Sequence, residues 1–172
     1  MPRFEIVEAK TQHCGQMVRK LRDDHKAAVT RLGVNTHREL RKAFDDSSYR
    51  RALLIDGVLS GLGGVTGPVM AATGMIWLAV TEEATRYPQH IAKIARRQIE
   101  LILTVKRELN AFVLPADEAS LRFAKFIGFQ TLRNTPVEIG EGTAVPMIIR
   151  KSPKVQYHRP NLDILDRPIW FN

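Results

Sequence analysis

The chain contains few residues of the kinds that act as nucleophiles or metal ligands. Cys14 is the only cysteine, and it directly follows His13, so the pair offers a nucleophile and a base. Neighbouring positions on a helix point about 100° apart, however, and their side chains seldom meet. His13, His25 and His37 are widely spaced and form no His-Glu-x-x-His pattern. We therefore expect neither a cysteine–histidine pair nor a metal site.

One glycine-rich segment is a candidate phosphate-binding loop. Residues Gly61–Pro68 read GLGGVTGP. A P-loop ends in Lys followed by Ser or Thr and opens a helix, because backbone N–H groups and the lysine hold the phosphates. This segment has neither feature, so we predict a turn or a bulge.

The C-terminal end carries a pair of large aromatic residues. Residues 151–172 contain three prolines and finish with Trp170, Phe171 and Asn172. We predict an irregular C-terminal arm here, next to a domain of residues 1–150. Trp170 and Phe171 could anchor the arm on its own domain or on a partner, and the sequence leaves both open.

Length and composition favour one core. The chain has 172 residues, of which 44% are hydrophobic, and its formal net charge is +8. This charge would favour non-specific contact with nucleic acid, although the basic residues alternate with apolar ones as solvated helix faces do. The longest apolar runs fall far short of the ~20 residues of a membrane span, so we expect none. The N-terminus lacks the apolar core of a signal peptide, which predicts a protein that is not secreted by that route.

The first half of the chain predicts a strand, two helices, a hairpin and a buried strand. Arg3–Glu8 alternates as a half-buried strand does. Thr11 and Thr36 are candidate N-caps, and Thr36 with Glu39 forms a capping-box pattern. The hairpin pairs Arg51–Ile55 with Val58–Leu62 through Asp56-Gly57, and Met75–Val80 is a continuously apolar central strand.

The second half predicts a long helix, a strand, a short helix and two closing strands. The long helix begins at Pro88, and its apolar face runs to Leu109. Ala111–Leu114 is a strand, Asp117 caps the short helix and Gly128 ends it. Phe129–Leu132 and Ala144–Ile149 are the closing strands. We therefore predict an α/β fold in which helices flank a central mixed sheet.

This order of elements resembles the GNAT (Gcn5-related N-acetyltransferase) fold over roughly residues 3–150. The family pattern is Asn-x-x-Ala/Ser, then a Tyr four residues on, then Gly-Phe four more residues on. Here the pattern reads Asp117, Ser120, Ala124 and Gly128-Phe129, so the spacing fits while Asp and Ala replace Asn and Tyr. The chain is more specifically similar to small GNAT-like proteins of tailed bacteriophages, including internal virion proteins. They share a Trp-containing strand, a Lys/Arg-rich long helix and the segment Ser120–Gly128.

The resemblance implies a site for acyl-CoA. The pantetheine arm would pair with the backbone of a central strand, and the pyrophosphate would lie on the N-terminus of the next helix. The residues implied are Leu78, Ala79, Val80, Arg86, Gln89, His90 and Asp117. The family places two glycines in the pyrophosphate turn, and both are missing here.

The resemblance also implies where acid and base would lie. A GNAT enzyme needs a base for the amine proton and an acid for the leaving thiolate, usually the Tyr that Ala124 replaces. Tyr87 is the candidate substitute acid, and Glu82 and Glu83, with His90 near them, are candidate bases. Each also has a plainer interpretation, as a surface acid or as a first-turn residue of the long helix.

Two functions follow from this resemblance. The first is a phage GNAT-like protein without efficient acetyl transfer, serving in the virion or host cytoplasm as a structural or assembly component. Its partners would be other virion proteins, bound through the arm. The second is an active N-acetyltransferase that uses acetyl-CoA on a protein or small-molecule amine. Fold alone does not decide between them.

Overall fold

The computed structural model describes residues 1–132, 136–151 and 169–170, which form a mixed sheet with helices on both faces. Its strands lie in the order β6-β8-β5-β4-β3-β2-β1-β9, and β7 pairs with β8. Strands β4 and β5 run parallel, and the other strand pairs are antiparallel. The strands are β1 (Phe4–Glu8), β2 (Ser47–Ile55), β3 (Val58–Thr66), β4 (Thr73–Val80), β5 (Glu108–Val113), β6 (Gln130–Thr131), β7 (Val137–Ile139), β8 (Gly142–Arg150) and β9 (Ile169–Trp170).

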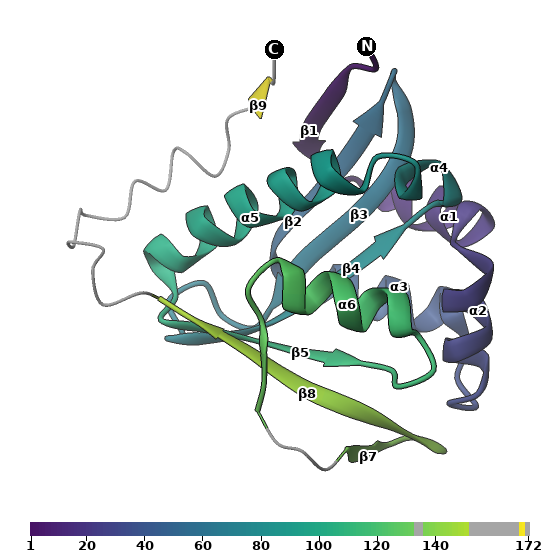
Figure 1. The fold of residues 1–172 in the computed structure, drawn as a ribbon, viewed down its shortest axis with the longest axis vertical. Helices are drawn as coiled ribbons and strands as arrows, with labels where there is room; N and C mark the ends of the chain where they lie inside the picture. The colour runs from purple at the N-terminus through teal and green to yellow at the C-terminus, as the bar shows by residue number, and fades with distance from the viewer. Residues whose placement is uncertain (133–135, 152–168, 171–172) are drawn as a thin grey trace.

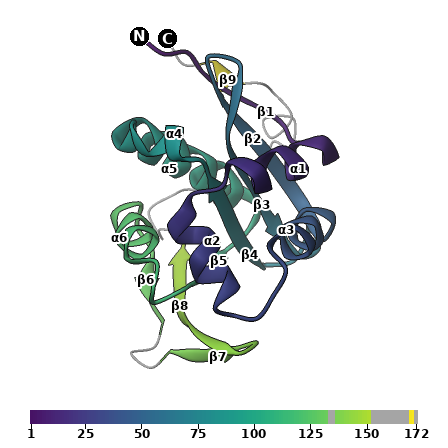
Figure 2. The same cartoon turned by 90° about the vertical axis from the view of Figure 1, so that its right-hand side faces the viewer.

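The helices divide between the two faces of this sheet. In Figure 1 helices α5 and α6 lie in front of the strands, whereas Figure 2 shows α1, α2 and α3 together on another side. Helices α1 and α3 pack on each other and on β3. The helices are α1 (Thr11–Lys20), α2 (Asp23–Thr30), α3 (Thr36–Asp45), α4 (Glu82–Thr85), α5 (Pro88–Val105) and α6 (Glu118–Phe126). The predicted α/β class and mixed, helix-flanked sheet are confirmed.

Several local signals are also confirmed. Asp56 and Gly57 both have positive φ, 49° and 77°, as the tight turn between β2 and β3 requires. Pro88 is the first residue of α5, where its missing N–H costs no helical hydrogen bond. The Asp117 side chain accepts a hydrogen bond from the Ser120 N–H and caps α6, and Gly128 follows that helix with a φ of 112°.

Other boundaries were wrong. The segment Gly61–Pro68, predicted as a turn or a bulge, is mostly strand, because β3 continues to Thr66 between β2 and β4. The pairing of β2 with β3 does shift register at the start of this segment, between Leu53 and Leu54, which pair with Gly61 and Leu59. The long helix ends at Val105, and Leu109 lies in β5. The chain between the first strand and the hairpin forms three helices rather than two.

The helix caps near the N-terminus also differ from prediction. Asn35, not Thr36, caps α3 by accepting a hydrogen bond from the Arg38 N–H. Lys10 occupies the N-cap of α1, and Thr11 is the first helical residue.

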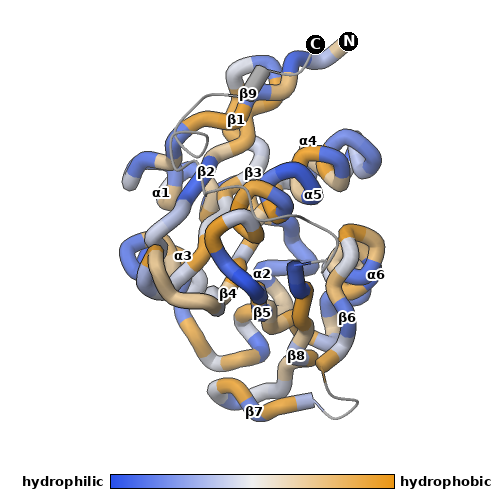
Figure 3. The backbone as a smooth tube through the Cα atoms, turned by 90° about the vertical axis from the view of Figure 1, so that its left-hand side faces the viewer, coloured by the Kyte–Doolittle hydropathy of each residue, from blue (hydrophilic) through white to orange (hydrophobic). Residues whose placement is uncertain are grey.

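Three clusters of buried side chains make up the core. One lies between the sheet and helices α1 and α3, and includes Met17, Phe44 and Leu62. The other two lie beneath α5 and α6, one around Val65 and Ile102, the other around Phe4 and Ile91. Figure 3 shows both colours along α5, as expected for a helix with one buried face.

The predicted irregular arm falls mostly on residues 152–168 and 171–172, outside the described part of the chain. Within the described part, Ile169–Trp170 forms β9 and pairs with Glu5 and Ile6 of β1, so this short piece is a strand rather than irregular. None of the helices among the described residues is long and apolar enough to cross a membrane.

Candidate functional site

The parallel strands β4 and β5 separate along their length. They pair only from Thr73–Met75 with Glu108–Asn110, near their N-terminal ends. Beyond Met75, β4 remains paired with β3 as far as Val80 on its other side, and β5 remains paired with β8 as far as Val113. The two strands therefore open into a V-shaped gap, which we call the splay.

One edge of β4 faces the splay with unpaired backbone groups. The Thr81 N–H donates to the Ser60 carbonyl, on the β3 side. Because successive residues of a strand direct their N–H and C=O groups to opposite sides, Leu78 directs both groups away from β3. No strand among the described residues pairs with β4 on this side between Met75 and Val80. The edge at Leu78 can therefore accept another extended chain.

Arg22 closes the wide end of the splay. Its N–H donates to the Val80 carbonyl at 3.3 Å, at the end of β4. Its guanidinium donates to both carboxylate oxygens of Asp117, which follows β5, at 2.8 and 3.0 Å. One residue of the α1–α2 link thus connects the two arms of the splay.

Asp117 is a buried carboxylate, and both of its oxygens accept hydrogen bonds. It is 3% exposed. Besides Arg22, it accepts hydrogen bonds from the Ser120 N–H at 3.0 Å and the Ser120 hydroxyl at 2.6 Å. Burial alone would raise its pKa, but the contacts with His25 and Ser120 and the charge of Arg22 hold the pKa well below its usual range. Asp117 is therefore ionised at neutral pH.

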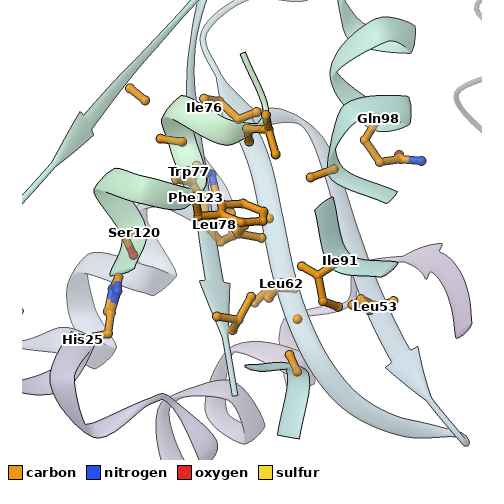
Figure 4. Close-up of a pocket in the computed structure, with 18 of the residues that line it drawn as sticks. His25, Leu53, Leu62, Ile76, Trp77, Leu78, Ile91, Gln98, Ser120 and Phe123 are labelled. Atoms are coloured by element: carbon orange, nitrogen blue, oxygen red, sulfur yellow. The ribbon is translucent and has the colours of Figure 1, made fainter. Parts of the chain in front are cut away.

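His25 lies against this carboxylate. Its Nδ1 is 3.4 Å from the Asp117 Oδ2, and its side chain is 29% exposed. Figure 4 shows the His25 ring beside Ser120, with His25 on α2 and Ser120 on α6. A carboxylate at Nδ1 favours the tautomer that carries a proton there, which leaves Nε2 free to accept one. The pair therefore has the arrangement of a base and the group that orients it.

A cavity of about 600 Å³ fills the splay and continues beneath α5. Its walls are mostly apolar and come from β2, β3, β4, β5, α5 and α6, as Figure 4 shows for Leu53, Leu78 and Phe123. Its polar side chains include Arg22, Asp24, His25, Glu82, Asp117 and Ser120, together at the wide end, and Tyr49, Arg51 and Gln98 under α5. The volume is in the range of small-molecule sites.

The predicted acyl-CoA residues fall in two places. Leu78, Val80 and Asp117 line the cavity, whereas the Ala79 side chain is buried on the opposite face of the sheet. The other three lie at the start of α5, outside the cavity lining. There Arg86 forms an ion pair with Glu83 at 2.9 Å, Gln89 is exposed, and the His90 ring stacks on Phe4 at 4.8 Å. Their role in binding stays a prediction.

The predicted catalytic residues are also divided. Glu82 lines the cavity, and its carboxylate accepts a hydrogen bond from the Asp23 N–H at 3.3 Å. Glu83 and Tyr87 do not line it, and the Tyr87 ring instead packs edge-on against Phe4 at 5.6 Å. Ala124, at the position where the resemblance expects Tyr, lines the cavity and is 8% exposed. The catalytic roles remain predictions.

Nothing in the sequence indicated that Arg22 and His25 belong to this site. Arg22 and His25 lie more than 90 positions before Asp117 in the chain. His25 appeared only as one of several scattered histidines. The helical break at Leu21–Arg22, which would have separated α1 from α2, was the missed local feature. Among the described residues no group of three or more His, Cys, Asp or Glu side chains could hold a metal ion.

Solved structures of acetyltransferases share this architecture. Aminoglycoside acetyltransferase AAC(6')-Ib in complex with coenzyme A superposes with a TM-score of 0.63 at 14% identity, covering 86% of this chain and 95% of that one. A GNAT-family acetyltransferase from Bacillus anthracis gives a TM-score of 0.64 at 13% identity, covering 87% of this chain and 98% of that one. A GNAT-family acetyltransferase from Streptococcus pneumoniae gives a TM-score of 0.59 at 13% identity, covering 87% of this chain and 99% of that one.

These likenesses concern the fold. No protein-family model matches the sequence, and no curated protein matches it. The chain has the GNAT acyl-CoA N-acyltransferase fold: a mixed α/β sheet, opened between β4 and β5 and flanked by helices.

Proposed function

We propose that this GNAT-fold chain binds acyl-CoA in the splay and transfers the acyl group to an amine. The observation that carries the proposal is the unpaired edge of β4 at Leu78, which borders a cavity of about 600 Å³. The pantetheine arm has amide groups that can pair with such an edge as an added strand does. Several structures of this fold contain coenzyme A or acetyl-CoA, which supports the same ligand here.

Bound acyl-CoA supplies the acyl group as a thioester, and its transfer to an amine yields an amide and CoA with a free thiol. His25 accepts the proton that the amine loses, at Nε2. Asp117 orients the His25 ring through Nδ1, while Arg22 and Ser120 hold the carboxylate in place. Ala124 has no proton to give, so the proton of the thiol comes from His25 or from water.

The charges at the wide end of the splay support a cationic amine as acceptor. Asp24 and Glu82 line the cavity there, beside His25. Asp24 forms an ion pair with Arg22 at 2.7 Å but remains half exposed. Carboxylates at this mouth attract a protonated amine, which then loses its proton to the base.

The test is release of free CoA thiol from acetyl-CoA in the presence of a panel of peptide and small-molecule amines. We expect amine-dependent release that falls by about 100-fold in His25→Gln, without a matching loss of acetyl-CoA binding. His37→Gln is the matched control, because His37 is exposed on α3 and does not line the cavity. Equal rates in the wild type and His25→Gln would remove His25 from the mechanism.

A second candidate is the structural role in a phage particle that the resemblance implied. Ala124 in place of the family Tyr favours it, as does the ion pair that engages Arg86 near the expected pyrophosphate position. In that case no amine in the panel would release thiol, and the protein would occur at fixed stoichiometry in purified particles. The aromatic pair Trp170 and Phe171 would then contact other virion proteins, which stays a prediction.

A further inference from the structure

We infer that the part of the cavity beneath α5 takes the alkyl chain of an acyl group longer than acetyl, so that the acyl donor is a medium-chain acyl-CoA. This inference rests on the proposed function, because it concerns the acyl group of the same ligand. We call this part the α5 chamber; Leu53, Gly61, Gly63, Ile94, Ala95 and Gln98 line it.

The α5 chamber exists because small residues face one another between two core clusters. On α5, Ile94 packs into one cluster and Ile99 into the other, and Ala95 lies between them. Opposite, Gly61 and Gly63 of β3 present no side chain. A Cβ at Gly63 would lie 3.1 Å from the Trp77 carbonyl oxygen and 3.3 Å from Leu78 Cδ1, so larger residues are disfavoured there.

The floor of the α5 chamber differs chemically from the splay. Gly61 and Gly63 are paired with β2 on one side and β4 on the other, so the backbone groups of the floor already belong to the sheet. The amides of a pantetheine arm would find no backbone partner there, whereas the β4 edge at Leu78 offers them. An alkyl chain needs only apolar walls, which Leu53, Ile94 and Ala95 supply in the chamber.

The far end of the α5 chamber is polar. The Tyr49 hydroxyl donates to Gln98 Oε1, and Arg51 lies over the Tyr49 ring at 4.6 Å. An alkyl chain that reached these side chains would cover polar groups without replacing their contacts. This end therefore sets an upper limit on chain length.

The experiment measures dissociation constants of a ladder of acyl-CoAs, from acetyl through butyryl, hexanoyl and octanoyl to palmitoyl, by calorimetry on the full chain. Burying a methylene tightens binding on the order of fourfold, so we expect hexanoyl-CoA to bind at least about tenfold more tightly than acetyl-CoA. Affinity should stop rising before palmitoyl-CoA.

Ala95→Leu fills the α5 chamber from the helix and keeps a good helix former. It should leave acetyl-CoA binding unchanged and remove the preference for hexanoyl-CoA. Arg97→Leu, on the exposed face of α5, is the matched control and should keep the preference. If Ala95→Leu does not fold, the smaller Ala95→Val serves the same purpose.

The outcomes separate the two proposals. Equal binding of acetyl-CoA and hexanoyl-CoA by the wild type would overturn the chain-length inference and leave acyl-CoA binding intact. A preference that survives in Ala95→Leu would place the alkyl chain elsewhere and overturn the α5 chamber as its site. No binding of any acyl-CoA would overturn the proposed function itself.

Discussion

Arg22 and Asp117 form a buried ion pair across the open end of the sheet, with Nη2 to Oδ1 and Oδ2 distances of 2.8 and 3.0 Å. Arg22 is 8% exposed and Asp117 is 3% exposed. Through its own N–H, Arg22 also bonds to the end of β4. The pair therefore fixes the width of the splay and the position of the carboxylate behind His25.

Replacing Asp117 with Asn should destabilise the protein by about 3 kcal/mol at neutral pH, because the change leaves the Arg22 charge buried without that partner. Urea denaturation measures the free energy of unfolding. Asp24→Asn is the matched control. Asp24 also contacts Arg22, but it is half exposed, so the loss should be about 1 kcal/mol or less. Similar losses of unfolding free energy in the two variants would show that the buried Asp117 stabilises the protein no more than the half-exposed Asp24 does.

The effect of Asp117→Asn should depend on pH. The pKa of Asp117 lies below its ordinary value of 3.8 in the folded protein, so the unfolded state binds this proton more readily. The stabilising contribution is therefore complete above about pH 4 and declines as the pH falls towards the folded pKa. Denaturation curves at several pH values should show the difference between wild type and Asp117→Asn shrinking below about pH 4. A difference that grows on acidification would contradict this pKa direction.

Lys106 should stabilise the loop between β3 and β4. It is 4% exposed, and its Nζ lies 2.9–3.4 Å from four backbone carbonyls, those of Pro68, Val69, Ala71 and Thr73. Lys106→Met removes these hydrogen bonds and should cost about 2 kcal/mol of unfolding free energy. Lys93→Met, on the exposed face of α5, is the control and should change stability little. Equal stability of the two variants would argue against this interpretation.

Two Gly→Ala substitutions should have opposite signs. At Gly64 a Cβ would lie 2.7 Å from the Tyr49 carbonyl oxygen and 2.8 Å from the Ser47 hydroxyl, so Gly64→Ala should cost about 1–3 kcal/mol. At Gly15, within α1, the nearest atom to an added Cβ outside the adjacent helix backbone is Arg19 Nη1 at 3.9 Å, so Gly15→Ala should add up to about 1 kcal/mol through helix propensity. Thermal denaturation checks both. A stabilised Gly64→Ala would contradict the close approach of Gly64 in β3 to Tyr49 and Ser47 in β2.

The sequence predicted those elements whose signals are local. Asp117 as a cap and Gly128 as a helix end are read within a few residues, as is the Asp56-Gly57 turn. The glycine-rich segment Gly61–Pro68 was predicted as a turn or a bulge, and glycine does have a low strand propensity. Pairing with β2 and β4 on both sides outweighs that propensity.

The candidate site was less accessible to sequence reasoning. Asp117 was identified by resemblance, but its partners Arg22 and His25 come from a distant segment, and no periodic pattern connects them. The cavity arises from the divergence of β4 from β5 and from glycines that face α5, which are properties of tertiary packing. A residue such as Tyr87 was a reasonable substitute acid by position, yet its ring packs on Phe4 outside the cavity lining.

Thermal denaturation of the wild-type chain in increasing acetyl-CoA tests whether the protein binds acyl-CoA, and it needs neither an acceptor nor a variant. Binding in the splay predicts a saturable rise in stability, reaching about 2.7 kcal/mol at a ligand concentration 100 times the Kd. An unchanged melting temperature at millimolar acetyl-CoA would contradict acyl-CoA binding by this protein.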